Sequence, residues 1–274
     1  MEATRNPGSP PRRAWPGKGG VVLCLLAAAG CEINVSGIDR DVDVLATESF
    51  QRTIAAPTQA DLRIEAVNGE ILVFGDPDLD AVEVDALKQV GSDSRRDANR
   101  WLDRVDIRIT ELGNEIRIET IQPRDNNGRL VEVDYLIRVP IDMNVIASHV
   151  NGSVEIETLD ADAVVFHVNG DVSLLDVFGS ASVDLVNGRV DAEVWLPEDG
   201  VIDLDVTNGD INLDVPASVS AELRARVTNG SVSVSGLTLI DPVTTSRSIE
   251  ATLGGGRGLV DLETVNGTIR IRGF

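Results

Sequence analysis

The dipeptide Asn-Gly recurs along this chain and limits the possible folds more than any other feature. With a shared flanking pattern it occurs at 68–69, 151–152, 169–170, 187–188, 208–209, 229–230 and 266–267, while the Asn-Gly at 127–128 lacks this pattern and is interpreted as a loop. From residue 151 the successive intervals are 18, 18, 21, 21 and 37 residues. Repetition at such spacing is typical of repeat architectures, in which each unit buries its apolar face only by stacking on its neighbours. The longest interval fits two units, one of which lacks the marker.

The residues on either side of each Asn alternate between apolar and polar types. The positions three residues after the Asn hold Ile71, Val154, Val172, Val190, Ile211, Val232 and Ile269. The positions four residues before it hold Ile64, Ala147, Val165, Val183, Leu204, Ala225 and Leu262. The neighbours of these apolar positions are mostly polar. Because period-two alternation indicates a half-buried strand, each unit is predicted to be a strand, a turn and a second strand.

Two all-β architectures fit this pattern. Asn-Gly between alternating strands is a strong hairpin signal, which would give an antiparallel β-meander or sandwich. The same dipeptide at a corner would let successive units stack in parallel as a β-solenoid, or single-stranded β-helix, with rungs of 18–21 residues. Matching residue types in matching columns favour the solenoid, because stacked rungs place like side chains on like at about 4.8 Å. The antiparallel alternative stays open at this point.

The N-terminus predicts export. Basic residues precede a short apolar run at 21–29, as in a signal peptide. The following Ala28-Ala29-Gly30-Cys31 resembles the bacterial lipobox, in which the cysteine is lipidated and becomes the new N-terminus. Residues 1–30 are therefore interpreted as a lipoprotein signal peptide and Cys31 as the lipid-attachment residue. An ordinary signal peptide cut nearby is the alternative.

The remaining chain divides into three parts by its periodicity. Residues 31–60 show little alternation and are interpreted as a tether. Residues 61–140 contain one clear repeat unit, a short helix at 94–102 and several further strands, and are interpreted as an irregular N-terminal cap. Residues 141–274 form the predicted β-solenoid array. Atypical ends are expected in such arrays because they block edge-to-edge pairing.

Charge and residue types exclude several partners and cofactors. The net charge of −21 would repel nucleic acid, so no nucleic-acid partner is expected. The two histidines, His149 and His167, occupy one inward column two residues before an Asn, and the spacing supplies no third ligand for a transition metal. Many aspartates occur without the Gly-Gly-x-Gly-x-Asp spacing of calcium-binding repeats, which indicates a solvated acidic face. No metal or other cofactor is predicted.

The repeat units resemble a known family. Ala66-Val67-Asn68-Gly69-Glu70-Ile71 opens the region, Tyr135-Leu136-Ile137-Arg138-Val139-Pro140 precedes the array, and Val168-Asn169-Gly170-Asp171-Val172 represents its units. Over residues 61–274 this order of elements resembles a bacterial family of unknown function known as "putative adhesin". The resemblance implies a β-helix-like fold and an adhesive role, with no catalytic residues to carry over.

Three hypotheses for the function follow. The first is a non-enzymatic adhesin or surface scaffold, attached to the outer membrane or another membrane of the cell envelope through its lipid, which presents a rigid acidic solenoid to a surface glycan or protein. The second is a periplasmic sensor or assembly module that binds another envelope protein, with Phe166, Phe178 and Trp195 as candidate contact residues. The third, a polysaccharide-acting β-helix enzyme, lacks the expected cluster of basic residues or paired carboxylates with aromatic platforms. No enzymatic activity is predicted.

Overall fold

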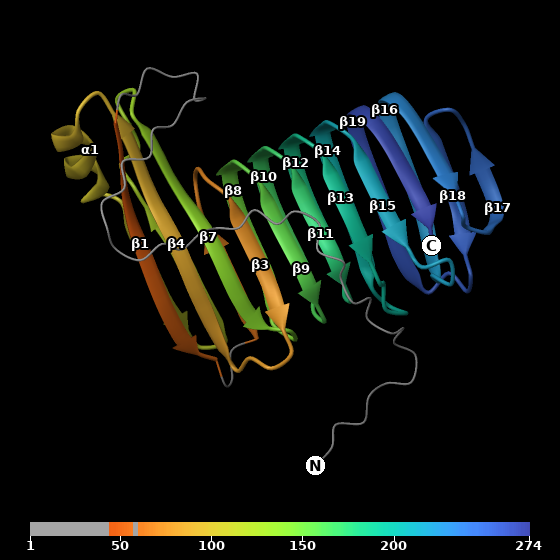
Figure 1. Ribbon diagram of the computed structural model, residues 1–274. Coiled ribbons are helices and arrows are strands. Elements are labelled where there is room, and N and C mark those ends of the chain that lie inside the picture. Colours follow the sequence, from red (N-terminus) through yellow and green to blue (C-terminus); the bar gives the residue numbers. More distant parts are fainter. Residues whose placement is uncertain (1–43, 57–59) are drawn as a thin grey trace, which may run out of the picture. The chain divides into compact units, whose positions relative to one another are not determined.

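The computed structural model describes residues 44–56 and 60–274, in which the regular structure is almost entirely β (Figure 1). The single helix of this described part is α1 (Arg95–Leu102). The all-β fold class is therefore confirmed. The predicted signal peptide and the lipid-attachment residue Cys31 lie outside the described residues.

The strands form two ladders, which we call face A and face B. In order of pairing, face A contains β5 (Asp106–Leu112), β6 (Glu115–Ile121), β2 (Asp61–Glu65), β8 (Asn144–Asn151), β10 (Ala163–Asn169), β12 (Ala181–Asn187), β14 (Val201–Asn208), β19 (Gly258–Gly273), β16 (Ala221–Ser235), β18 (Ser248–Leu253) and β17 (Leu239–Thr244). Face B contains β1 (Val44–Ala55), β4 (Ala81–Ser92), β7 (Leu130–Pro140), β3 (Ile71–Asp76), β9 (Val154–Leu159), β11 (Val172–Val177), β13 (Val190–Val194), β15 (Ile211–Val215) and then the second halves of β19 and β16.

The repeat units stack in parallel, which confirms the solenoid and excludes the meander for the array. Each rung contributes one strand to face A, turns at Asn-Gly and contributes the next strand to face B. Equivalent residues pair between rungs, as Val165 does with Ala147 on one side and with Val183 on the other. The predicted apolar columns are buried in one continuous core, except that Val232 on β16 is half-buried against it.

The backbone at Asn-Gly explains why the hairpin did not form. A two-residue type I′ hairpin needs positive φ at both central residues. Among the described residues the glycines of six Asn-Gly turns have φ between +117° and +153°, whereas their asparagines do not have positive φ. The turn therefore changes the direction of the chain from one face to the other without reversing it within a face.

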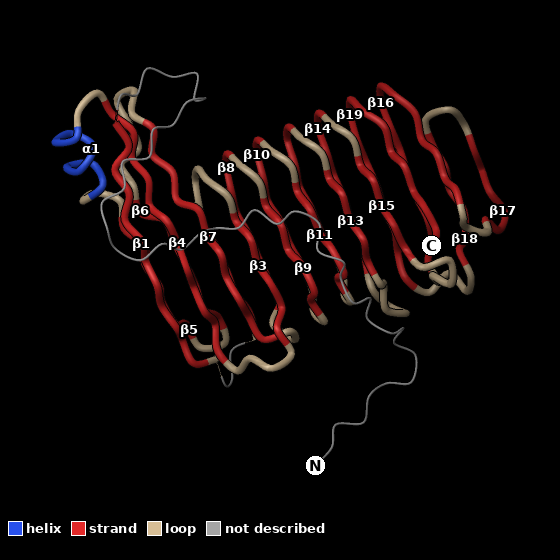
Figure 2. Tube along the Cα trace, in the orientation of Figure 1, coloured by secondary structure: helices blue, strands red, loops and turns tan. Residues whose placement is uncertain are grey.

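The asparagine side chains join the turns in a continuous row. Each side-chain amide donates to the side-chain oxygen of the Asn in the preceding rung, at 2.7–2.9 Å. In spatial order the row contains Asn68, Asn151, Asn169, Asn187, Asn208, Asn266 and Asn229. Such amide ladders are also found in cross-β stacks, where identical residues repeat at the strand spacing. Figure 2 shows the turns aligned at the ends of successive strands.

Glycine is required beside each asparagine because the rungs approach closely there. A Cβ atom on Gly209 would lie 1.6 Å from the carbonyl oxygen of Gly188, and one on Gly170 would lie 1.6 Å from that of Gly152. Real Cβ atoms never approach an oxygen this closely, so any side chain would push the rungs apart. The Asn-Gly repeat thus encodes hydrogen bonding by Asn and close stacking by Gly.

The order of the rungs in space differs from their order in the sequence at both ends. The last repeat, β19, lies between the rung of β14 and β15 and the earlier strand β16. The first repeat, β2 with β3, likewise lies between the rung of β6 and β7 and that of β8 and β9. The interpretation of the 37-residue interval as two rungs is therefore wrong, because β17 and β18 between them form an antiparallel edge beside β16.

The N-terminal part contains one element that the sequence analysis did not predict. Residues 44–55, within the segment interpreted as a tether, form β1, which pairs antiparallel with β4 along its whole length. The helix predicted at 94–102 is confirmed as α1. Its N-cap Ser94 accepts from the amide of Asp97, and Trp101 and Leu102 are buried. This helix packs against β1 and β4, where it covers that end of the core.

The close stacking at glycine predicts a large difference between two alanine substitutions. Gly209→Ala should lower the free energy of unfolding by about 3–5 kcal/mol, because it adds a clash between rungs to the strained φ of +150°. Gly128→Ala is the control, since Gly128 also has positive φ (+82°) but nothing lies within 4 Å of its added Cβ. It should cost about 1 kcal/mol. Denaturant unfolding would measure both, and equal losses would show that close stacking does not require glycine.

Candidate functional site

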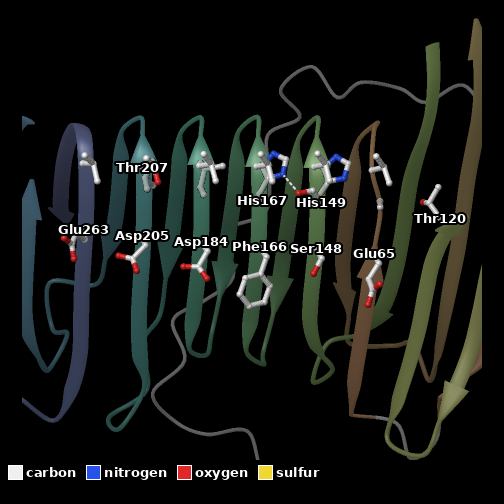
Figure 3. Close-up of a pocket in the computed structure, with 18 residues that line it drawn as sticks. Glu65, Thr120, Ser148, His149, Phe166, His167, Asp184, Asp205, Thr207 and Glu263 are labelled. Atoms are coloured by element: carbon white, nitrogen blue, oxygen red, sulfur yellow. Dashed lines mark hydrogen bonds between the residues drawn. The ribbon is translucent and has the colours of Figure 1, made fainter. Parts of the chain in front are cut away.

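An open groove of about 900 Å³ runs along face A beside the Asn-Gly turns (Figure 3). It crosses β2, β8, β10, β12, β14 and β19, so its side chains come from successive rungs of the stack. The groove is therefore a consequence of the repeat, with its walls fixed by the register of the strands.

Two rows of outward side chains line the groove. The valine row, one residue before each Asn, contains Val67, Val150, Val168, Val186, Thr207 and Val265. The acidic row, three residues before each Asn, contains Glu65, Ser148, Phe166, Asp184, Asp205 and Glu263. Because side chains alternate along a strand, the residue between the two rows points into the core. The groove thus has an apolar side next to the turns and a mainly acidic side away from them.

Apolar side chains remain exposed on this surface. Phe166 is 45% exposed, and Val150, Val168, Val186 and Val265 are 37–41% exposed. Phe166 pairs in register with Ser148 on one side and with Asp184 on the other. Contiguous exposed apolar groups beside charges are characteristic of surfaces that bind a partner.

The carboxylates are concentrated at one end of the acidic row. Asp184 pairs in register with Asp205, which pairs with Glu263, so three successive rungs each present a carboxylate. None of the three forms an ion pair within residues 44–56 and 60–274. The nearest basic residue in the next strand, Arg226, is paired with Glu250 at 2.7 Å.

The crowding of these acids changes their proton affinity. A second pair, Asp203 and Asp261, lies two residues before Asp205 and Glu263 on the same strands. Partial loss of water around its carboxylate, together with the charges of Asp203 and Glu263, raises the pKa of Asp205 to about 6. The same two causes raise the pKa of Asp203, for which Asp261 is the nearest charge. The acidic end of the groove therefore carries an excess of negative charge, although Arg224 lies in register beside Asp261 on β16.

The two histidines lie beneath the groove in the predicted inward column. Both are 3% exposed, and their rings stack with centroids 5.1 Å apart. Nε2 of His149 donates to the carbonyl oxygen of Gly69 at 2.9 Å, and Nε2 of His167 lies 3.0 Å from that of Gly152. Thr264, in the same column, donates to Gly209 at 3.1 Å. The column therefore holds polar groups that bind the glycine carbonyls of the preceding turns.

His149 is held in its neutral form by this environment. Burial lowers its pKa, and its Nδ1 has no hydrogen-bond partner among the described residues. Ser148 adjoins it in sequence but points outward, so the two side chains do not form a nucleophile–base pair. No three or more His, Cys, Asp or Glu side chains in the described part of the chain are arranged to hold a metal ion.

The structure separates the three aromatic residues that the sequence analysis singled out. Phe166 lies in the groove, whereas Phe178 and Trp195 follow the face-B strands β11 and β13 and stack at 5.3 Å. Trp195 also contacts Phe274 edge-on at 5.2 Å. Its indole nitrogen is buried without a partner among the described residues. These residues therefore form a separate aromatic cluster and do not extend the groove.

A carboxylate pair on face B was not recognised in the sequence. Glu155 and Glu157 lie two residues apart on β9, and burial together with a hydrogen bond to Glu155 raises the pKa of Glu157 to about 8. Because side chains alternate along a strand, the sequence shows that Glu155 and Glu157 lie on the same face. It does not show that Asp176 of the next rung lies close to them.

Comparison with known families identifies the array. Residues 142–272 match the family model described as Toastrack DUF4097. The array, just under half of the chain, is therefore similar to the Toastrack family. The groove extends from the Toastrack region into the preceding part of the chain through Glu65, Ala66, Val67 and Thr120.

Two solved structures also match most of this chain at low identity. A putative cell adhesion protein from Clostridium sporogenes is 11% identical, with 84% of this chain and 100% of that chain covered at a TM-score of 0.49. A putative adhesin from Bacteroides fragilis is 10% identical, with 83% and 97% covered at a TM-score of 0.31. Among curated proteins, none matches the sequence. No helix in the described residues has the length and apolar character needed to cross a membrane.

The raised pKa of Asp205 predicts that removing its charge stabilises the protein. Between pH 3.8 and about 6 the folded state binds more protons at this site than the unfolded state, so stability falls as the pH rises through this range. Asp205→Asn should therefore raise Tm by about 2 °C at pH 8 and have no such effect below pH 3.8.

Asp214→Asn is the matched control, because Asp214 lies on the neighbouring strand β15 and is paired with Arg272. This change should leave Tm unaltered or lower it at pH 8. Thermal unfolding followed by circular dichroism would measure both variants, and a lower Tm for Asp205→Asn would contradict the charge crowding described above.

Proposed function

We propose that this protein is a non-enzymatic, adhesin-like binding scaffold of the bacterial cell envelope, anchored by a lipid on Cys31. In this proposal the stacked rungs present the groove to another component of the cell surface. The observation that carries it is the exposure of Phe166 and the valine row along a groove built from strands.

Exposed apolar groups in a hollow support binding for an energetic reason. Burying them against a partner gains about 25 cal/mol per Å² of apolar surface removed from water. The asparagine row and the parallel register hold these side chains in place before any partner arrives. A preorganised surface loses less conformational entropy on binding than a mobile loop does.

The chemistry of the groove supports recognition in preference to catalysis. Ser148 points outward while its neighbour His149 points inward and binds Gly69, so this histidine does not act as a base for the serine. Nucleophilic catalysis by a hydroxyl needs a base within hydrogen-bonding reach. The acidic row stabilises positive charge, which suits the binding of cations.

Exposed apolar residues inside the groove should contribute to binding, and those outside it should not. Phe166→Ser combined with Val168→Ser should lower the retention of isolated bacterial envelope fragments on the immobilised protein by about tenfold, because both residues would contact the partner. The control combines Phe274→Ser with Val243→Ser, since Phe274 is also 45% exposed and Val243 is 64% exposed. Equal retention by the two double variants would exclude the groove as the binding surface.

The anchor is tested separately. Wild-type protein produced in a Gram-negative host should begin at an acylated Cys31 by mass spectrometry and should fractionate with membranes. Cys31→Ser should be recovered unacylated, because a serine hydroxyl does not replace the thiol in the lipobox-type processing. Wild-type protein without acyl groups would contradict the anchor and leave the groove unaffected.

A further inference from the structure

The two rows of the groove impose a combined requirement on any ligand. One side offers carboxylates on three successive rungs, Asp184, Asp205 and Glu263, and the other side offers the exposed valine row. Figure 3 shows the acidic side chains aligned along the stack with Phe166 among them. A ligand that satisfies both sides needs positive charges along one edge and apolar groups along the other.

The spacing of the strands sets the length and shape of this ligand. From β2 to β19 the groove crosses six face-A strands, whose separation of about 4.8 Å gives a length of about 24 Å. An extended peptide rises about 3.3 Å per residue, so an octapeptide would span about 26 Å. Successive side chains of an extended peptide point to opposite edges. A sequence that alternates apolar residues with Lys or Arg therefore presents one kind of side chain to each row. Groups on one edge of the peptide are about 6.6 Å apart, and the long Lys and Arg side chains can bridge the difference from the rung spacing of about 4.8 Å.

Charge complementarity favours this class over other cations. The crowded acids Asp203, Asp205 and Asp261 have no ion pair among the described residues, so a cationic partner would relieve their mutual repulsion. The carboxylates follow a line along the stack and do not converge on one point, which suits charges distributed along a chain. A polyamine would satisfy this line but would leave Phe166 and the valine row exposed.

We propose that the groove binds an extended cationic peptide segment, with alternating apolar and Lys or Arg side chains, laid across β2, β8, β10, β12, β14 and β19. This inference rests on the proposed function, because it specifies the chemistry of what the scaffold binds. The apolar side chains lie against the valine row and Phe166, and the basic side chains reach Asp184, Asp205 and Glu263.

The test uses the full-length chain carrying Cys31→Ser and a dye-labelled octapeptide of alternating Lys and Val, followed by fluorescence anisotropy. The groove variant combines Asp184→Asn, Asp205→Asn and Glu263→Gln. The matched control combines Glu155→Gln, Asp176→Asn and Asp191→Asn, which removes three carboxylates from face B. We expect the groove variant to weaken peptide binding at least about tenfold and the control to weaken it less than about twofold. Circular dichroism would verify that both variants are folded.

Two comparison peptides and a polyamine complete the experiment. An octapeptide of alternating Lys and Ser should bind more weakly than the Lys-Val peptide, and one of alternating Glu and Val should not bind. Equal weakening by both triple variants would overturn the proposal, since it would show general attraction to an acidic protein. Equal binding of the Lys-Ser peptide or of spermine would overturn it too, because the valine row would then have no role.

The outcome is separable from that of the proposed function. If no cationic peptide binds while envelope retention still depends on Phe166 and Val168, the peptide inference fails and the scaffold function stands. If the Lys-Val peptide binds in the groove but envelope retention does not depend on these residues, the peptide site stands and the scaffold function fails.

Discussion

The close approach of successive turns is the constraint on which the rest of this structure depends. Each glycine carbonyl lies where the Cβ of the next rung would be, and each asparagine amide binds the asparagine of the rung before it. These contacts fix the register of every strand pair, because shifting a strand by one residue would turn its apolar residues outward. The continuous core, the inward histidine column and the two rows of the groove all follow from that single register.

The sequence was sufficient to predict the array because its signals are local and repeated. The columns that contain Val165, Val183 and Leu204 identify the inward face, and Ser94 before a polar turn identifies the start of α1. The groove was harder to foresee. Phe166 appeared as an isolated exception in a polar column, and only the register shows that it lies between Ser148 and Asp184. The aromatic pair Phe178 and Trp195 belongs to another turn, although its residue types suggested the same role.

The rearrangement at the two ends could not be read from spacing alone. An interval of 37 residues is long enough for two rungs, and it is equally long enough for one rung followed by the antiparallel strands β17 and β18. The choice depends on which strand lies beside β14, and that is a long-range pairing without a local sequence signal. β1 was missed for a related reason, since it pairs only on one side and exposes most of its residues, which weakens the alternation.

In the acidic groove, carboxylates that repel one another lie on a surface that is ordered before any partner binds. Burial, and then the charges of its neighbours, raises the pKa of Asp205, whereas the repeat places the neutral Ser148 in the same row. Natural proteins commonly depart from such local rules at functional sites. The glycine and asparagine contacts of the turns lie beside these acids. The mutually repelling carboxylates are therefore held on a part of each rung whose register is fixed.

The two ends of the described chain should resist a pulling force differently, because β19 lies between two other strands whereas β1 lies at a border. A force applied at the C-terminus pulls on a strand that is hydrogen-bonded along both edges, to β14 and β15 on one side and to β16 on the other. Its extraction requires many parallel hydrogen bonds to shear together. A force applied at the N-terminal side reaches β1 first, a border strand bonded only to β4 among the described residues. Under tension the N-terminal border should therefore yield before the C-terminal rung, and the groove, which lies between them, would keep its shape while β1 detaches.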